Sequence, residues 1–210
     1  AVVLAEPAHQ QASLVWSWVG VAQGHLLRGD GDEAAVALAH ADEVGDSPVG
    51  TSAATRERTR AWLTACRGDL PAARTHVAAI ADAMQSDGVI VFEAVLRHDL
   101  VRFGDAAAAV GRLAELAAVI EGPWIRVMAD HALAVASHDA ALLQLAVDQF
   151  EAIDSIVFGA EAALELAELH RQAGQPRPAA AAERRAQRLI ERSGGARTPG
   201  LTRGTAAVPL

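Results

Sequence analysis

The sequence predicts an all-α fold, an α-solenoid of about five antiparallel helix pairs. Three observations predict it: a tripeptide that returns at a near-constant spacing, apolar residues at helical spacing between chain breakers, and an unusual composition. The hydrophobic fraction is 51%, yet the aromatic fraction is only 4%. The core must therefore consist largely of Ala, Leu and Val, which lets helices approach closely and favours helix over sheet.

The recurring tripeptide has the chemistry of a corner between two helices. Its copies are Arg28-Gly29-Asp30, Arg67-Gly68-Asp69, Phe103-Gly104-Asp105, Ser137-His138-Asp139 and Ala173-Gly174-Gln175, with central residues 39, 36, 34 and 36 positions apart. The central residue suits the left-handed backbone after a helix, and the following Asp can accept from free N–H groups of the next helix. At three of the corners an Arg would lie in the last turn of the helix before it, namely Arg28, Arg67 and Arg102. Its positive charge would meet the negative end of the helix dipole there. A cell-adhesion signal is the alternative, but the corner also explains the copies without Arg or Asp.

The first pair comprises residues 9–27 and 33–44. Its first helix carries apolar residues at helical spacing, namely Trp16, Val19, Leu26 and Leu27. Gly, Ser and Pro over residues 45–50 then indicate a loop. Three acids lie near the corner, Asp30, Asp32 and Glu33. A calcium loop needs ligands spread over about twelve residues, so we interpret these acids as helix caps.

The second pair comprises residues 51–67 and 70–85, with Pro71 in the first turn of a helix, where its missing N–H costs nothing. The third pair begins with Val89-Ile90-Val91-Phe92, which could be a buried strand. The apolar series continues to Phe103, so its length favours a helix. The partner helix carries an i, i+3, i+7, i+10 stripe, Val110, Leu113, Ala117 and Ile120, before Gly122-Pro123.

The fourth pair comprises residues 124–136 and 140–153, and the fifth comprises 156–171 and 177–192. We expect one apolar face on the helix over 140–153, formed by Leu142, Leu145, Ala146, Gln149, Phe150 and Ile153. The last helix is rich in Arg but keeps an apolar core stripe, Ala182, Ala186, Leu189 and Ile190. We interpret it as the helix that closes the end of the repeat stack, with its outer face exposed to solvent. Its arginines could also lie beside nucleic acid.

These elements predict one helical-repeat domain over residues 1–195. Residues 196–210 contain Pro199, Gly200, Gly204 and Pro209 without an apolar period, so we expect a flexible linker there. The opening residues 1–5 resemble the end of a truncated helix rather than a signal peptide, because they lack a basic leader.

Composition excludes several classes of function. All 18 basic residues are Arg, so there is no P-loop lysine and no Schiff-base lysine. Cys66 is the only cysteine, which rules out an internal disulfide and a Cys-based zinc cluster and suits a packing residue in a reducing compartment. No apolar run approaches the roughly 20 residues that span a bilayer. We therefore expect a cytoplasmic protein with no membrane partner.

Charge is unevenly distributed along the chain. The net charge is −8, yet residues 171–210 hold 8 Arg and 2 Glu, whereas residues 1–170 hold 10 Arg and 24 acids. The body should repel nucleic acid, and only the C-terminal end could sit beside it.

Candidate catalytic residues are scarce. His76, His98-Asp99 and Asp130 could be assigned to a metal-dependent phosphohydrolase, but helix pairs in a stack would keep them on separate layers. The chain contains no His-Glu-x-x-His motif and no Gly-x-Ser-x-Gly motif. We expect no enzyme activity, no cofactor and no catalytic, cofactor-binding or metal-ligating residue. Trp62, Arg97 and Trp124 are candidates for a partner-binding groove, and the alternative for both Trp residues is ordinary core.

Three consecutive segments resemble a known family. They are residues 159–174, from Gly159-Ala160-Glu161 to Gln172-Ala173-Gly174, the Ala- and Arg-rich helix that follows, and Ser193-Gly194-Gly195-Ala196-Arg197-Thr198-Pro199. All three are similar to the helical region of LuxR-type transcriptional regulators of the large ATP-binding, maltose-regulator-like branch. In that family tetratricopeptide-like repeats stand between an ATPase and a C-terminal helix-turn-helix domain.

The resemblance implies a tetratricopeptide-like solenoid, a fragment without the ATPase and the DNA-binding domain. It implies a non-catalytic sensor or coupling arm of a bacterial regulator, with a protein partner or small-molecule effector in a concave groove. DNA would be bound only through a domain absent from this chain, and association into a homo-oligomer is compatible with this architecture. The alternative is a stand-alone helical-repeat scaffold for protein–protein interaction.

Overall fold

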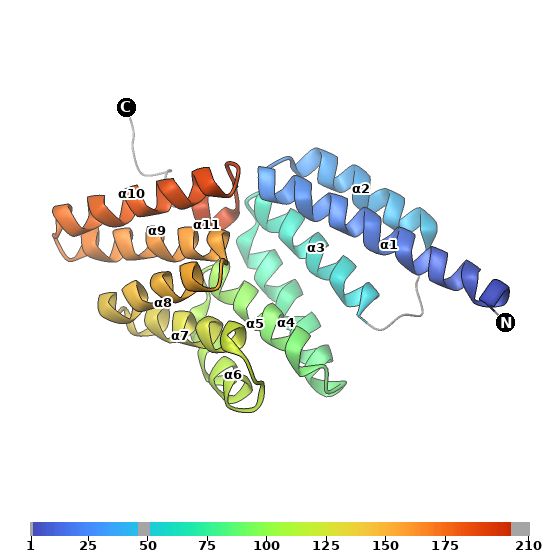
Figure 1. The fold of residues 1–210 in the computed structure, drawn as a ribbon, viewed down its shortest axis with the longest axis horizontal. Helices are drawn as coiled ribbons and strands as arrows, with labels where there is room; N and C mark the ends of the chain where they lie inside the picture. The colour runs from blue at the N-terminus through green and yellow to red at the C-terminus, as the bar shows by residue number, and fades with distance from the viewer. Residues whose placement is uncertain (1, 46–50, 203–210) are drawn as a thin grey trace. The chain divides into compact units, whose positions relative to one another are not determined.

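The computed structural model describes residues 2–45 and 51–202. Within these ranges every regular element is a helix (Figure 1). The helices are α1 (Val2–Arg28), α2 (Gly31–Val44), α3 (Ser52–Cys66), α4 (Leu70–Ser86), α5 (Ile90–Arg102), α6 (Ala106–Val119), α7 (Pro123–Ser137), α8 (Ala140–Ala152), α9 (Ile156–Gln172), α10 (Pro176–Arg192) and α11 (Pro199–Thr202). The all-α prediction is confirmed, including a helix rather than a strand in α5.

The chain forms two compact units, Ala1–Ile80 and Ala81–Leu210. The sequence predicts one continuous repeat domain over residues 1–195, whereas the division falls inside α4, where the sequence has no breaker. In the first unit α1 packs on α2 and α3. In the second unit each helix from α5 to α10 packs on the next one in sequence, and α11 packs on α9. None of the described helices combines the length and the hydropathy that a membrane span requires.

The predicted corners have the expected backbone. The central residue is left-handed in all five, with φ of 80° at Gly29, 94° at Gly68, 85° at Gly104, 53° at His138 and 68° at Gly174. The next residue donates its N–H to the carbonyl five positions earlier, at 2.9 Å from Asp30 to His25 and 2.8 Å from Asp105 to Leu100. This bond satisfies a carbonyl that the helix end leaves free.

The same corner also follows α4, α8 and α10, where the recurring tripeptide did not predict it. Gly88, Asp154 and Gly194 are left-handed, and the residue after each donates to the carbonyl five positions before it. Asp154 takes this conformation at φ 57° without being Gly, which Asp tolerates better than most residues. The same backbone corner therefore serves both within the helix pairs and at some of the junctions between them.

Side-chain capping follows the prediction at only some corners. Asp69, Asp105 and Asp139 accept backbone N–H groups of the following helix, with 3.1 Å between Ala72 N and Asp69 Oδ1. Asp30 makes no such bond and instead accepts from Arg28 Nε at 3.3 Å. The capping prediction is wrong for Asp30, because the flanking arginine occupies its carboxylate.

The core of the second unit centres on Phe150 in α8. The buried face of α8 consists of Leu143, Ala146, Val147 and Phe150. Leu142 and Leu145, which the sequence analysis placed on the apolar face, are 36% and 48% exposed. The two stripes share Ala146 and Phe150, and packing against α7 and α9 selects the one that continues through Leu143 and Val147.

The predicted linker is wrong for residues 196–202. Ala196, Thr198, Pro199, Gly200 and Leu201 are buried, and α11 packs on α9. Leu201 joins an apolar cluster with Ala160 and Leu189. Pro and Gly set the turns of this segment, but its few apolar side chains still find a partner surface. Residues 203–210 of the predicted linker lie outside the described residues.

Candidate effector cavity and its buried polar network

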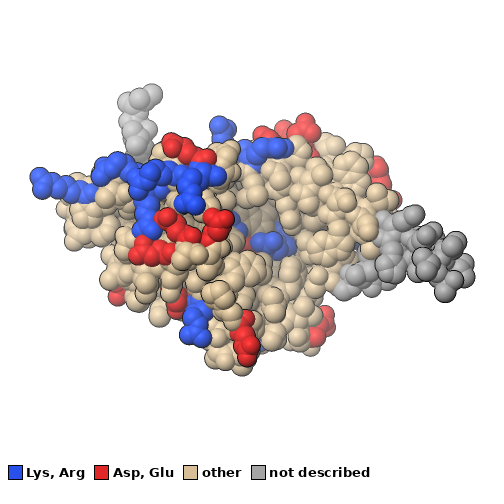
Figure 2. All heavy atoms as spheres, viewed as in Figure 1, with Lys and Arg blue, Asp and Glu red and all other residues tan. Residues whose placement is uncertain are grey.

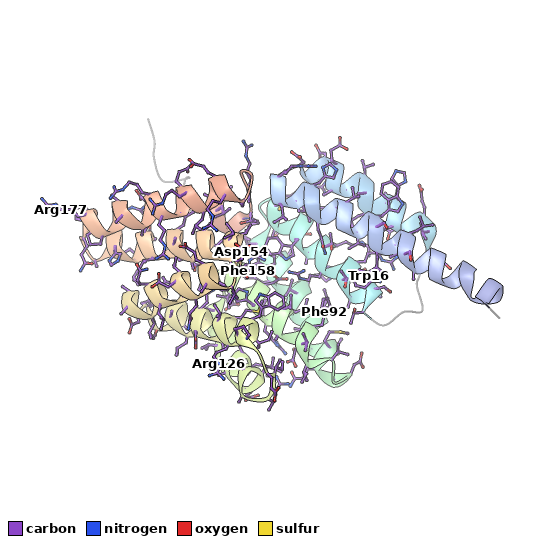
Figure 3. All side chains as sticks on the ribbon, viewed as in Figure 1. Trp16, Phe92, Arg126, Asp154, Phe158 and Arg177 are labelled. Atoms are coloured by element: carbon purple, nitrogen blue, oxygen red, sulfur yellow. The ribbon has the colours of Figure 1, made fainter. Side chains whose placement is uncertain are left out.

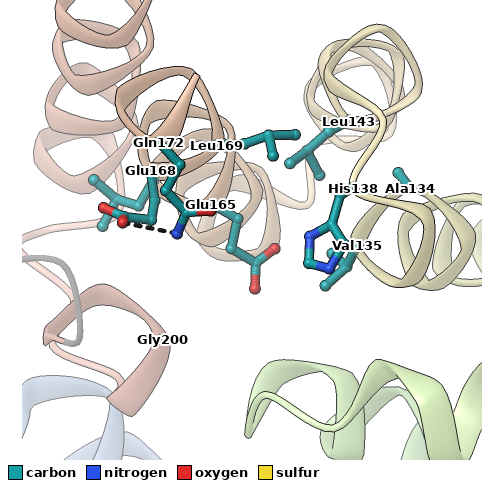
Figure 4. Close-up of a pocket in the computed structure, with 10 residues that line it drawn as sticks. Ala134, Val135, His138, Leu143, Glu165, Glu168, Leu169, Gln172 and Gly200 are labelled. Carbon is teal, nitrogen blue, oxygen red and sulfur yellow. Dashed lines mark hydrogen bonds between the residues drawn. The ribbon is translucent and has the colours of Figure 1, made fainter. Parts of the chain in front are cut away.

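A cavity of about 280 Å³ opens in the second unit among α7, α8, α9 and α11 (Figure 4). Its lining residues are Ala134, Val135, His138, Leu143, Leu164, Glu165, Glu168, Leu169, Gln172 and Gly200. Most of this lining is apolar, and its polar groups lie mainly on α9. The cavity volume lies just below the roughly 300–1,000 Å³ of most small-molecule sites, so it suits only a small ligand.

Glu165 is the acidic group that faces the cavity. Figure 4 shows its carboxylate between α9 and His138, and its side chain is 22% exposed. On the protein side, Glu165 Oε2 lies 2.7 Å from His131 Nε2. The carboxylate therefore has one oxygen fixed by the protein and a face open to the cavity.

Behind Glu165 two buried histidines continue the hydrogen-bonded chain. His131 Nδ1 lies 3.0 Å from His98 Nε2, and each histidine is only 1% exposed. Their rings pack edge-to-face on aromatic rings, His131 on Phe150 and His98 on Phe158, with centroids 5.4 Å apart in both pairs. Phe158 is labelled in Figure 3. The Phe150 and Phe158 rings help to shield the histidines from water, and the low local dielectric strengthens the hydrogen bonds between them.

A second buried network lies one turn away on α9. Arg102 donates to both carboxylate oxygens of Glu161, at 2.7 Å from Nε and 3.0 Å from Nη2, and it lies 3.4 Å from Asp99. The guanidinium also sits 4.4 Å from the centre of the Phe158 ring. Burial disfavours the charged guanidinium, but attraction and hydrogen bonding to Glu161 raise the pKa of Arg102 above its usual value. Arg102 therefore points into the core, and the prediction that it serves the dipole of its helix end is corrected.

Glu161 also fastens α11 to α9. Thr198, just before α11, donates its hydroxyl to Glu161 Oε1. A Cβ added to Gly200 would lie 2.9 Å from Glu161 Cδ, so the backbone of α11 touches this side chain. Gly200 also lines the cavity. Because Glu161 and Glu165 are one turn apart on the same face of α9, the cavity and the anchor of α11 share one helix face.

The residues that the sequence suggested for a hydrolase do not form one site. His98 Nε2 lies 3.0 Å from His131 Nδ1, and Asp130 accepts from Gln149 Nε2 at 3.1 Å. His76 pairs with Glu57 in the first unit. Over residues 2–45 and 51–202, no group of three or more His, Cys, Asp or Glu side chains is placed to hold a metal ion.

The three candidates for a binding groove have different surroundings. Trp62 is buried in α3, so it is a core residue. Arg97 pairs within its own unit, donating to Asp82 at 2.7 Å and to Gln85 at 3.0 Å. Trp124 remains 38% exposed at the start of α7. Of the three candidates, Trp124 is therefore the aromatic residue with a solvent-exposed surface that a partner could contact.

The last long helix has the two-sided character that its sequence predicts. Ala179, Ala182, Ala186 and Leu189 are buried, and the opposite face is basic. Positive side chains gather over α10 in Figure 2, and Arg177 projects from its first turn in Figure 3. Arg185 pairs with Asp148 and Glu151, which holds α10 on α8. Part of the basic character of α10 is therefore structural.

Comparisons with known proteins found no relative: no family model, no curated protein and no solved structure matches the chain.

Proposed function

We propose that this chain is the non-catalytic sensor and coupling arm of a LuxR-type transcriptional regulator of the large ATP-binding, maltose-regulator-like branch. In this proposal the helices are tetratricopeptide-like repeats, and the protein is cytoplasmic. The cavity beside Glu165 receives a small-molecule effector, and DNA is bound by a domain outside this chain.

The repeating corners support the helical-repeat part of the proposal. Left-handed residues recur after most of the described helices, as at Gly68, Gly104 and Gly174, each followed by the same backbone bond to the carbonyl five residues earlier. A chain of similar units that each pack on their neighbours is the construction principle of repeat proteins.

The observation that supports the coupling role is that Gly200 contacts both the cavity and Glu161. It lines the cavity and touches Glu161, while Thr198 beside it donates to the same carboxylate. A molecule in the cavity would contact α9 and α11 at once. Its binding energy can therefore favour one placement of α11, and with it the chain that follows Thr202.

The resemblance to regulators falls on the same part of the chain. Residues 159–174 and 193–199 form most of α9 and the segment before α11, and these two pieces hold each other through Glu161 and Thr198. In the family this region precedes the DNA-binding domain, which is where a coupling element is needed.

Two experiments test the proposal. The reading frame that encodes the chain should continue past Leu210 into a helix-turn-helix and should contain a P-loop before Ala1. In the intact regulator, Glu161→Gln should change promoter output by several-fold at equal protein level. Glu115→Gln, which alters an exposed ion pair with Arg112, is the matched control and should leave output unchanged.

A frame with neither domain would favour the alternative, a stand-alone helical-repeat scaffold. In that case the exposed Trp124 and its neighbours on α7 would be the first surface to examine for a protein partner.

A further inference from the structure

We propose that the cavity beside Glu165 binds a compact organic ammonium ion that carries an apolar group, with the Glu165 carboxylate as its counter-ion. The inference rests on the proposed effector role, since it names the chemical class of that effector. It follows from the charge, the hydrogen bonding and the size of the cavity.

The charged groups of the lining favour a cation. Three titratable side chains line the cavity, the carboxylates of Glu165 and Glu168 and the imidazole of His138, and the lining contains no Arg. Glu168 is already engaged, because it pairs with Arg171 and accepts from Gln172 Nε2 at 3.0 Å. Glu165 has no cationic Arg partner within the described ranges. An anion would meet two carboxylates there, whereas an ammonium ion would meet one that lacks a counter-charge.

The histidines behind Glu165 need not cancel its charge. His131 can donate from Nε2 to Glu165 and accept at Nδ1 from His98 Nε2, so both hydrogen bonds form with neutral imidazoles. The hydrogen bond with His131 holds the Glu165 side chain in a fixed rotamer. A fixed carboxylate at the wall of an apolar space binds a cation more strongly than a freely hydrated one.

The apolar wall and the volume define the rest of the ligand. Leu143, Leu164, Leu169 and Val135 supply the contact surface. The volume of about 280 Å³ is many times the roughly 10–15 Å³ that a cavity needs to hold one water, so it has room for a small organic molecule. A benzylammonium ion has about this size and pairs one ammonium with one apolar ring.

The test is a titration of the whole chain with three isosteric probes, benzylammonium, benzyl alcohol and benzoate, followed by calorimetry and by amide NMR shifts. We expect benzylammonium to bind, benzyl alcohol to bind at least about tenfold more weakly and benzoate not to bind. Glu165→Gln keeps an acceptor for His131 but removes the charge, and it should weaken benzylammonium at least about tenfold. Glu168→Gln is the matched control, because its carboxylate is already paired, and it should change the affinity less than about threefold.

Three results with the unmodified chain would each overturn the inference. They are equal affinity for benzylammonium and benzyl alcohol, stronger binding of benzoate than of benzylammonium, and no binding of benzylammonium at millimolar concentration. A Glu165→Gln chain that binds benzylammonium as tightly as the parent would overturn the role of this residue. The proposed function fails separately: ammonium binding that leaves promoter output of the intact regulator unchanged would refute the coupling role while the cation site stands.

Discussion

Glu161→Gln should destabilise the second unit strongly, because it breaks a fully buried ion pair on one side. Arg102 and Glu161 are 5% and 2% exposed, and two hydrogen bonds of 2.7 and 3.0 Å join them. The substitution removes the charge and places an NH₂ donor opposite the guanidinium or Thr198. Removing one partner of a buried pair typically costs about 3–5 kcal/mol. Asp99 still offers partial compensation at 3.4 Å, so we expect about 3 kcal/mol.

The assay is equilibrium unfolding of the whole chain in urea, followed by far-UV circular dichroism. Fluorescence of a Trp16→Phe/Trp18→Phe/Trp62→Phe background, in which Trp124 is the one tryptophan left, reports on residues 81–210. Arg102→Met should have a similar effect alone. The double variant should lose at least about 2 kcal/mol less than the sum of the single variants, because the second change removes the charge left unpaired by the first. A cost below about 1 kcal/mol for Glu161→Gln, or additive effects in the double variant, would show that the pair does not hold α9 as described.

Three further predictions concern the corners and the charge of the chain. Gly68→Val should destabilise the first unit by about 1 kcal/mol or more in thermal unfolding, because φ is 94° there and a β-branched residue fits that backbone poorly. As a contrast, Gly111 lies in the middle of α6 with open space around it. Gly111→Ala should therefore stabilise the fold by roughly 0.5–1 kcal/mol. Asp69→Ala should cost roughly 0.5–2 kcal/mol because the cap on Ala72 is lost, and a variant as stable as the parent would contradict the cap. If the proposed function is correct, the chain alone should not distinguish the promoter of the proposed regulator from a scrambled duplex in gel-shift titration at near-physiological salt, and a clear preference would place the DNA-reading element within it.

Local structure was largely predictable from the sequence because it depends on near neighbours. Left-handed corners follow from Gly at the position after a helix, and His138 takes the same place at φ 53°. The expected helices match α2 to α10 within a few residues at each end. Helix α1 begins at Val2 instead of residue 9.

The candidate site was not predictable, because it depends on contacts between distant residues. Glu161 and Arg102 are 59 positions apart, and His131 and Glu165 are 34 apart. The corner pattern assigned Arg102 to a helix end, which is correct for its place in the chain but not for its side chain. One clue was present: Glu161 and Glu165 interrupt the apolar face of α9 at a spacing of one turn.

Residues 196–202 were predicted to be a flexible linker, but the structure packs them against the repeat helices. Their Pro and Gly content predicted a linker, yet Thr198 and Leu201 are buried on α9 and α10. Turn residues describe the backbone of a segment and do not reveal whether a neighbouring surface will accept its side chains.

The most direct test of the coupling role is amide hydrogen exchange at Leu201 and Thr202 with the cavity filled. Both N–H groups donate to the Thr198 carbonyl, at 3.0 and 3.1 Å, so they report whether α11 stays closed. With saturating benzylammonium we predict several-fold slower exchange at both amides, with no such change for benzyl alcohol or in Glu165→Gln. Slower exchange around Glu165 with unchanged exchange at Leu201 and Thr202 would contradict the account, because occupancy of the cavity would then not be felt at α11.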